Sequence, residues 1–382
     1  MGMRHNENTA SVFILPRLER VISGPGALDV LPAELERYKG RRAVIVTGAT
    51  LGASALVDRV RSLLGTRSVA VFTGARQHVP ASTVAALAGL VRETDADVLV
   101  SVGGGSPIDT AKGVVHALLP HGDGSGAIPI HIAVPTTLSA GEFTDVAGIT
   151  DDETRIKHAV YDTRLAPRTV IADPEVTRQT PAWLWAASGV RALDHAVETL
   201  YARRPHPISE PLAERAIRLL VEHLPLSVND EGAGLDHRGA CQTAAWLAVF
   251  GVTNAGFGLS HVLGHQIGPR WAVAHGVTSA IVLPHAMRFM AGVAPDRFGP
   301  IARGLDLPYA GSDPGPGALA CAARVEALVA RLSLPRRLRD VSVPYAELGA
   351  VAEVVAGLMD RAAVVDRPVR AAELAEILEA AY

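Results

Sequence analysis

The sequence predicts an α/β protein in two parts, a doubly wound, mainly parallel β-sheet followed by an all-helical part. The chain has 382 residues, whereas single domains have roughly 100–200. Its first half alternates short β-branched runs with helical patterns, and its second half carries long Ala- and Leu-rich stretches without a comparable strand run. A stretch punctuated by Pro174 and Pro181 separates the halves. We therefore place the boundary near residue 178 and divide the chain into residues 1–178 and 179–382.

Short apolar runs mark the strands of the first part. They lie at residues 43–47, 69–72, 97–102 and 130–134. Between the second and third runs, residues 82–94 carry apolar side chains at i, i+3 and i+4 spacing, which predicts a helix. Because the strands are apolar on both faces, helices must cover both sides of the sheet. The alternation therefore predicts parallel strands joined by helical crossovers.

Helical patterns fill the second part. Residues 211–224 and 318–332 are long Ala- and Leu-rich stretches that predict helices. Residues 311–317 are rich in Gly and Pro, which predicts an irregular connection between helices. No internal repeat is present.

The composition excludes several classes of function. Hydrophobic residues make up 48% and charged residues 20% of the chain, as in ordinary globular proteins. Lys plus Arg number 36 and Asp plus Glu 39, a net charge of -3, so no basic excess is available to bind nucleic acid. No run approaches the roughly 18 apolar residues that cross a membrane, and the polar N-terminus lacks an export signal. With Cys241 and Cys321 as its two cysteines and no CxxC spacing, the sequence indicates a cytoplasmic protein without a disulfide framework.

A glycine-rich turn follows the third predicted strand. Three glycines, residues 103–105, permit a backbone turn that brings N–H groups close to an oxyanion. Ser106 is expected as the N-cap of a helix, Pro107 as its first residue and Asp109 as the partner in a capping box. The positive end of that helix would face a pyrophosphate at the tip of the sheet. The first part is thus predicted to be a Rossmann-like dinucleotide-binding domain, unless the turn merely caps a helix.

A second glycine turn, residues 47–52, ends the first predicted strand. It superficially matches the turn of short-chain dehydrogenases, but no Tyr stands four residues before a Lys, as that family requires. A carboxylate after this strand would bind the adenosine ribose and repel a 2′-phosphate, and Gly48 offers no such repulsion. We therefore expect either NAD or NADP as the cofactor.

Histidines cluster in the second part. His261 and His265 stand at i and i+4 on one helical face, and His275 follows ten residues later. Upstream, Arg191, His195 and Glu198 share one face at i, i+4 and i+7. A lone histidine is usually structural. An i, i+4 pair with further histidines nearby instead suggests a metal or catalytic site, because imidazole is a common metal ligand.

These motifs together resemble the iron-containing alcohol dehydrogenase superfamily over almost the whole chain. The shared features are the GGGSxxDxAK turn at residues 103–112, the spacing of the three downstream histidines and the helical second half. Residues 72–80 and 21–28 are similar to the maleylacetate reductase branch. The resemblance implies an NAD(P)-dependent oxidoreductase that forms a homodimer. The cofactor-binding residues that it implies are Gly103, Gly104, Gly105, Ser106, Asp109, Thr136 and Thr137, with Lys157 at the ribose.

One position departs from the family pattern. Metal-dependent members carry Asp where this chain has Arg191, and the ligands matching His195, His261 and His275 remain. A guanidinium has no lone pair and stays charged, so it would repel a divalent ion. A carboxylate plus a divalent cation carries net +1, and so does one arginine without metal. Alternatively, Arg191 only pairs with Asp194 at i, i+3.

The sequence therefore predicts an NAD(P)H-dependent reductase of a carbonyl or an activated C=C in a small, anionic substrate, without metal. Arg191 would stabilise oxyanion character or clamp a substrate carboxylate. His265 is expected near the nicotinamide as a proton donor or relay. The residues expected to line the site with it are Arg191, His195, His261 and His275. Two alternatives remain, an alcohol dehydrogenase with Fe or Zn on His195, His261 and His275, and a cofactor-binding protein without turnover.

Overall fold

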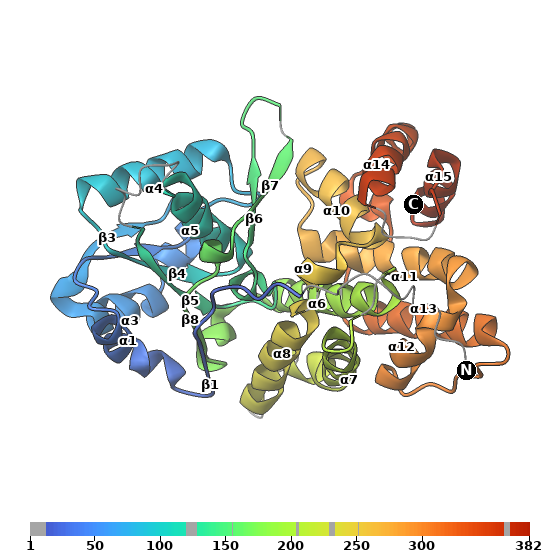
Figure 1. Cartoon of the computed structure of the whole chain (residues 1–382), viewed down its shortest axis with the longest axis horizontal. Helices are drawn as coiled ribbons and strands as arrows, with labels where there is room; N and C mark the ends of the chain where they lie inside the picture. Colours follow the sequence, from blue (N-terminus) through green and yellow to red (C-terminus); the bar gives the residue numbers. More distant parts are fainter. Residues whose placement is uncertain are drawn as a thin grey trace.

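The first part of the chain forms a parallel six-stranded sheet (Figure 1). The computed structural model describes residues 13–119, 128–154, 156–203, 206–228, 234–250, 252–362 and 367–382. The strands are β1 (Arg20–Ser23), β2 (Ala43–Val46), β3 (Ser68–Phe72), β4 (Val98–Gly103), β5 (Ile130–Pro135) and β8 (Thr169–Ala172), in the order β1-β8-β5-β4-β2-β3. Every pairing in this sheet is parallel. The predicted α/β class is confirmed, and the four predicted strands match β2 to β5.

Helices cover both faces of the sheet, as the apolar strands require. Helices α1 (Leu31–Arg37) and α3 (Ala55–Leu64) pack on one face, and α4 (Ala81–Glu93) and α5 (Gly105–Ala117) on the other. Successive side chains of β4 alternate between them, since Val98 and Val100 join the core under α1 and α3 whereas Leu99 joins the core under α4 and α5. A short helix, α2 (Ala49–Gly52), follows β2.

A two-stranded antiparallel hairpin, which the sequence did not predict, stands beside the sheet. Its strands are β6 (Val146–Thr150) and β7 (Lys157–Tyr161), and Thr150 pairs with Lys157. In Figure 1 the hairpin stands between the sheet and the helices that follow. It therefore brings Lys157 toward the helical part.

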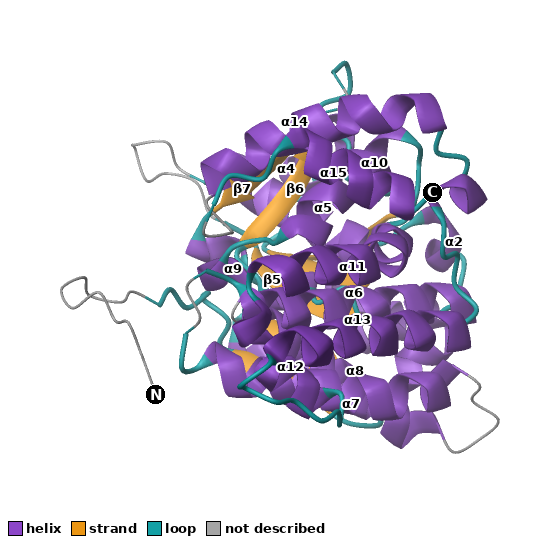
Figure 2. Cartoon of the chain, turned by 90° about the vertical axis from the view of Figure 1, so that its right-hand side faces the viewer, coloured by secondary structure: helices purple, strands orange, loops and turns teal. Residues whose placement is uncertain are grey.

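The second part is built around one buried helix, α6 (Ala182–Tyr201). Every residue of α6 from Trp185 to Tyr201 is buried, and α6 packs against α7, α8 and α11. Figure 2 shows α6, α11 and α13 between a lower group with α7, α8 and α12 and an upper group with α10, α14 and α15. The remaining helices are α7 (Ser209–Val228), α8 (Gly234–Val249), α9 (Val252–Ala255), α10 (Leu259–Arg270), α11 (His275–Val293), α12 (Gly299–Gly304), α13 (Pro314–Arg331), α14 (Leu348–Ala362) and α15 (Ala371–Ala380).

Two predicted helix starts are wrong. Helix α5 begins at Gly105 rather than at Pro107, and the residue before it is Gly104 rather than Ser106. Gly104 has an extended backbone and leaves Ser106 inside the first turn, so the predicted capping box does not form. Helix α13 begins at Pro314, within the segment predicted to be an irregular connection, because proline is well tolerated in a first helical turn.

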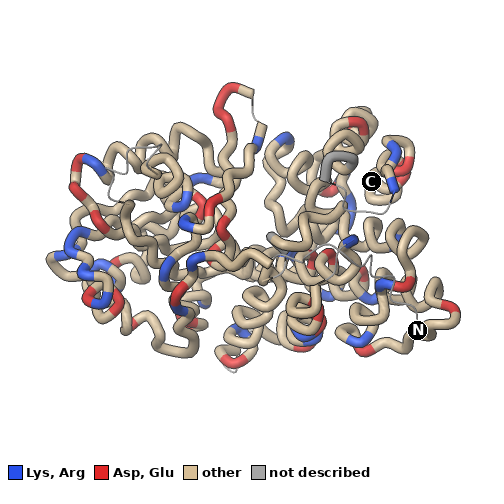
Figure 3. Tube along the Cα trace, in the orientation of Figure 1, with Lys and Arg blue, Asp and Glu red and all other residues tan. Residues whose placement is uncertain are grey.

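Charges of both signs are interspersed along the trace of both parts (Figure 3). Within the described residues, no helix is long and apolar enough to cross a membrane. Cys241 and Cys321 are both buried, free thiols. The N-terminal residues on which the prediction of no export signal rests lie outside the described residues.

Candidate active site

The turn after β4 leaves the N-terminal amides of α5 open at the carboxyl edge of the sheet. Gly103 has a φ of 142°, in the region that favours glycine. No side chain caps α5. The first N–H groups of a helix have no partner within it, and the positive end of the helix dipole lies at the same place. The turn is thus a site for an anion such as a phosphate.

The loop after β5 packs directly on these glycines. The N–H of Thr136 donates to the carbonyl of Gly103 at 2.9 Å. A Cβ on Gly104 would lie 3.0 Å from Cγ2 and Oγ1 of Thr137, closer than side chains normally approach. Because Gly104 has no Cβ, the side chain of Thr137 can occupy the space beside it.

This edge of the sheet fits a dinucleotide cofactor. A pyrophosphate needs backbone N–H donors and close approach, and the glycine turn offers both. Strand β2 lies next to β4, so the turn at Gly48 opens beside the phosphate turn, on the side expected for the adenosine ribose. Asp109 differs from the rest of the predicted set, since its carboxylate faces the backbone of Gly148 in the hairpin. The residues that would hold the cofactor are Gly103, Gly104, Gly105, Ser106, Thr136 and Thr137.

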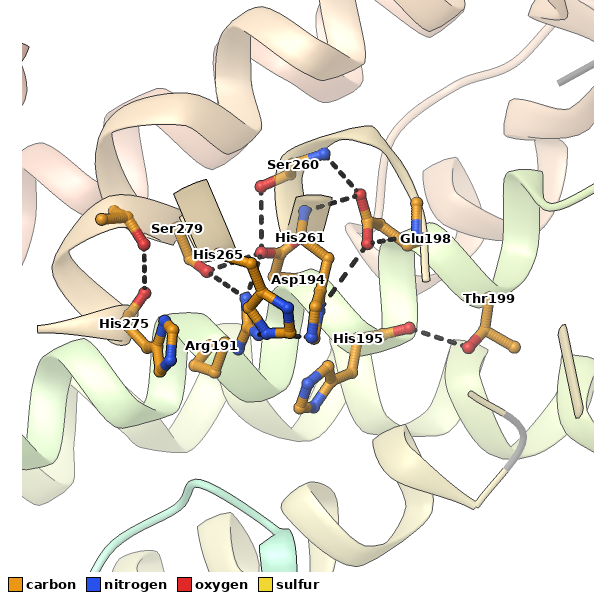
Figure 4. Close-up of polar contacts among 12 residues, drawn as sticks. Arg191, Asp194, His195, Glu198, Thr199, Ser260, His261, His265, His275 and Ser279 are labelled. Atoms are coloured by element: carbon orange, nitrogen blue, oxygen red, sulfur yellow. Dashed lines mark hydrogen bonds and ion pairs between the residues drawn. The ribbon is translucent and has the colours of Figure 1, made fainter. Parts of the chain in front are cut away.

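The four histidines singled out by their spacing lie together in the helical part (Figure 4). His261 and His265 project from α10 with ring centroids 4.6 Å apart. The ring of His195 on α6 lies 5.2 Å from that of His261. His275, the first residue of α11, lies 5.1 Å from His265. Three helices thus supply one continuous row of imidazoles.

Arg191 points into the same row and is almost fully buried, with 7% of its side chain exposed. Its Nη2 donates to Nε2 of His261 at 2.5 Å and lies 3.5 Å from Nε2 of His265. Its Nη1 lies 3.4 Å from the carboxylate of Asp194 and 3.1 Å from Oγ of Ser279. The arginine therefore makes the i, i+3 pair and also faces the histidines.

Two acidic residues of α6 fix the start of α10. Asp194 accepts a hydrogen bond from Oγ of Ser260 at 2.9 Å. Glu198 accepts from the backbone N–H groups of Gly258 at 2.9 Å and Ser260 at 2.7 Å. A Cβ on Gly258 would lie only 2.4 Å from the Glu198 carboxyl carbon, so the glycine permits this contact. These bonds hold His261 against Arg191.

Two residues from the sheet part complete the cluster, and neither was predicted there. Nζ of Lys157 lies 3.3 Å from Nε2 of His275. The ring of His78 stands edge-on to His275 with centroids 5.2 Å apart. His78 and Val79 both have left-handed backbones, with φ of 64° and 52°, which is costly for a β-branched residue. The only sequence signal for His78 was the stretch at residues 72–80 that resembles maleylacetate reductases.

The surroundings keep these imidazoles neutral. Burial lowers the pKa of His195, His261, His265 and His275 well below the ordinary value, and the nearby cations add to the effect. Burial also lowers the pKa of His78 to about 4. Arginine only donates, so Nε2 of His261 acts as an acceptor and Nδ1 of that ring carries the proton.

Comparisons with known proteins agree with this two-part architecture. The family model described as iron-containing alcohol dehydrogenase matches residues 18–174, and the model of the family's C-terminal part matches residues 185–382. Maleylacetate reductase 2 of Cupriavidus pinatubonensis is 37% identical over 78% of this chain and 77% of its own length. The 1,3-propanediol dehydrogenase of Klebsiella pneumoniae is 31% identical over 87% of this chain and 89% of its own.

Solved structures show the same fold. A 1,3-propanediol oxidoreductase superposes with a TM-score of 0.89 at 29% identity, covering 98% of this chain and 100% of the other. Maleylacetate reductase from a Rhizobium strain superposes with a TM-score of 0.80 at 26% identity, covering 98% of each. A sheet edge shaped for a dinucleotide and a buried polar cluster beside it are the two parts of a nicotinamide-dependent oxidoreductase. The chain belongs to the iron-containing alcohol dehydrogenase family, near its maleylacetate reductase branch.

A divalent metal does not fit the side chains at this site. The resemblance implies His195, His261 and His275 as ligands, but Nε2 of His261 accepts from Arg191 and Nε2 of His275 faces Lys157. In the part of the chain that the structure describes, no three His, Cys, Asp or Glu side chains are arranged to hold a metal ion.

Proposed function

We propose that the protein uses NADH or NADPH to reduce a carbonyl or an activated C=C of a small anionic substrate without a metal. The contact of Arg191 with His261 and His265 is the observation that carries this proposal. This contact supports the view that the guanidinium of Arg191 provides a permanent positive charge at the position where metal-dependent members carry an acid. The relatives named maleylacetate reductase favour the same kind of reaction.

The cofactor side is assigned to the glycine turn. The amides of Gly103 to Gly105 and of Ser106 would hold the pyrophosphate, and Thr136 and Thr137 would flank the nicotinamide half. Lys157 is assigned to the ribose by the resemblance alone. When bound, the reduced nicotinamide supplies a hydride to the substrate.

Arg191 would stabilise the negative charge that develops on the substrate oxygen. His265 and His275 are partly exposed, whereas Arg191, His195 and His261 are buried. A substrate therefore meets His265 and His275 first, and the guanidinium acts on it from directly behind His265. Removal from water strengthens this interaction, because less solvent screens the charges. Asp194 and the imidazoles keep the guanidinium oriented.

His265 would move the proton that the reduced oxygen or carbon requires. Its Nε2 faces Arg191, which leaves its Nδ1 with the proton. Because burial lowers the pKa of His265 well below its ordinary value, the ring is neutral near pH 7. Because Nε2 stays against Arg191, the partly exposed ring can pass on its Nδ1 proton and take another there from water. We therefore assign His265 to a proton relay.

Replacement of Arg191 tests the proposal. Arg191→Ala should lower kcat/KM for 2- and 3-oxo acids by about 10²–10³, the scale for loss of one oxyanion donor. The dissociation constant of NADH, measured by fluorescence titration, should change less than threefold. Equal losses of turnover and cofactor affinity, or a lower melting temperature alone, would show that Arg191 serves only as the partner of Asp194.

A further inference from the structure

A pair of histidines outside the proposed active site lies between α7 and α8. Nδ1 of His223 on α7 is 2.9 Å from Nδ1 of His237 on α8, and the ring centroids are 5.1 Å apart. The two helices pack against each other (Figure 1), and neither carries a residue of the row of imidazoles. Both rings are partly exposed. A small solute can therefore reach the pair without entering the active site.

Buried contacts one helical turn further along hold the two helices in place. Ser227 and Cys241 each follow one of the two histidines by four residues, so each shares the helical face of its histidine. Oγ of Ser227 lies 3.6 Å from Sγ of Cys241 and accepts a hydrogen bond from Nε1 of Trp185 on α6 at 2.8 Å. All three side chains are fully buried. The separation of the two imidazoles is therefore set by the core, without the help of a ligand.

The surroundings of the pair favour a cation. Oε1 of Glu222 lies 3.7 Å from Nε2 of His223. A carboxylate only accepts, so Glu222 favours the tautomer of His223 that has its proton on Nε2 and a lone pair on Nδ1. Histidines that bind metals are commonly oriented by a carboxylate in this way. Cys241 is not a further ligand, because burial raises the pKa of its thiol to about 12.

The distance between the two Nδ1 atoms matches one coordination geometry. With metal–nitrogen bonds of about 2.0 Å, two imidazole nitrogens lie roughly 2.8 Å apart at a right angle and roughly 3.3 Å apart at a tetrahedral angle. The observed 2.9 Å is close to the first value. Right angles are typical of square-planar and tetragonal sites with nitrogen and oxygen ligands, which Cu²⁺ and Ni²⁺ prefer. Tetrahedral Zn²⁺ would require the rings to move apart.

We propose that His223 and His237 bind one Cu²⁺ or Ni²⁺ ion through their Nδ1 atoms, with water at the remaining positions. Without an ion, His237 donates its Nδ1 proton to the lone pair of His223. When the ion binds, that proton moves by exchange with water to Nε2 of His237. Small rotations of the rings then direct both lone pairs at the ion. The ion would link α7 to α8 and take no part in the reduction proposed above.

Calorimetric titration of the protein without an affinity tag by NiCl₂ tests the proposal. We expect the wild type to bind one Ni²⁺ ion per chain, with a dissociation constant at least tenfold higher in His223→Ala and in His237→Ala. His158→Ala removes an exposed histidine on β7 and is the matched control, which should bind Ni²⁺ as the wild type does. Circular dichroism before the titration checks that each variant is folded. Ni²⁺ should also raise the melting temperature of the wild type but not of His223→Ala, because an ion that binds only the folded state stabilises it.

Bound Cu²⁺ identifies the ligands independently of the affinity. Its electron paramagnetic resonance spectrum should be tetragonal and show coupling to two imidazole nitrogens. The proposal is overturned if the wild type binds no Ni²⁺, or if His223→Ala binds it as tightly as the wild type. Loss of binding in His265→Ala instead would also overturn it, because the ion would then lie in the row of imidazoles. None of these measurements involves turnover, so the proposed function can fail while this site stands.

Discussion

Contacts with charged groups orient the side chains of this site as much as packing does. Arg191 turns a lone pair of the His261 imidazole toward a permanent donor, which fixes the protonated nitrogen of that ring. The i, i+4 spacing paired Arg191 with His195 and His261 with His265, and the family resemblance brought both pairs and His275 into one hypothesis. The sequence was not sufficient for Lys157 and His78. Their positions depend on how the hairpin and the loop before α4 pack against a helix far along the chain.

His265 is the residue whose loss should affect turnover most selectively. His265→Ala should lower kcat by about 10²–10⁴ if the imidazole relays the proton, with the dissociation constant of NADH within threefold of the wild-type value. His158→Ala, which removes an exposed histidine on β7, is the control and should leave kcat unchanged. An unchanged kcat in His265→Ala would remove this residue from the mechanism.

The accuracy with which each strand and helix was predicted depends on how distinct its local sequence pattern is. Strands β2 to β5 were predicted to within one residue at each end, because each contains a continuous apolar run. Strands β1 and β8 were missed because their apolar runs are shorter, two residues in β1 and three in β8. The start of α5 was placed two residues late, since Ser106 and Pro107 are common at helix starts and only the extended backbone of Gly104 decides otherwise.

The glycine turn before α5 should control cofactor affinity. Gly104→Ala would place its Cβ 3.0 Å from Thr137 and force that side chain to move. We expect the dissociation constant of NADH to rise roughly tenfold, which corresponds to about 1.4 kcal/mol. Gly89→Ala on α4 has open space around its Cβ and should leave NADH binding unchanged. Equal affinity in the two variants would show that the turn does not hold the cofactor.

The contact between α6 and α10 should contribute strongly to stability. Glu198→Ala would leave the N–H groups of Gly258 and Ser260 buried without a partner, at a cost of roughly 1–3 kcal/mol for each. Glu198→Gln keeps one acceptor oxygen, so its loss should be less than half as large. Thermal unfolding followed by circular dichroism compares the two. Equal melting temperatures for the wild type and Glu198→Ala would contradict this account of how α10 is held.

For the whole molecule, the structure combines a cofactor edge on the sheet with a row of imidazoles in the helical part, and the hairpin connects them through Lys157. The boundary near residue 178, the homodimer and the cytoplasmic location stay predictions from the sequence. Both the first long helix, which begins at Ala182, and the last strand, which ends at Ala172, are consistent with that boundary. The proposal for the whole site is that Arg191 supplies the positive charge that an ion supplies in metal-dependent members.

Turnover measured together with the metal content of the protein tests this proposal. The protein is purified with and without a chelator, its Fe and Zn content is measured, and oxidation of NADH and NADPH is followed with oxo acids and aldehydes. We predict unchanged kcat after chelation, with much less than one metal ion per chain and no gain on adding Fe²⁺ or Zn²⁺. Loss of activity on chelation, restored by one equivalent of either metal, would contradict the account.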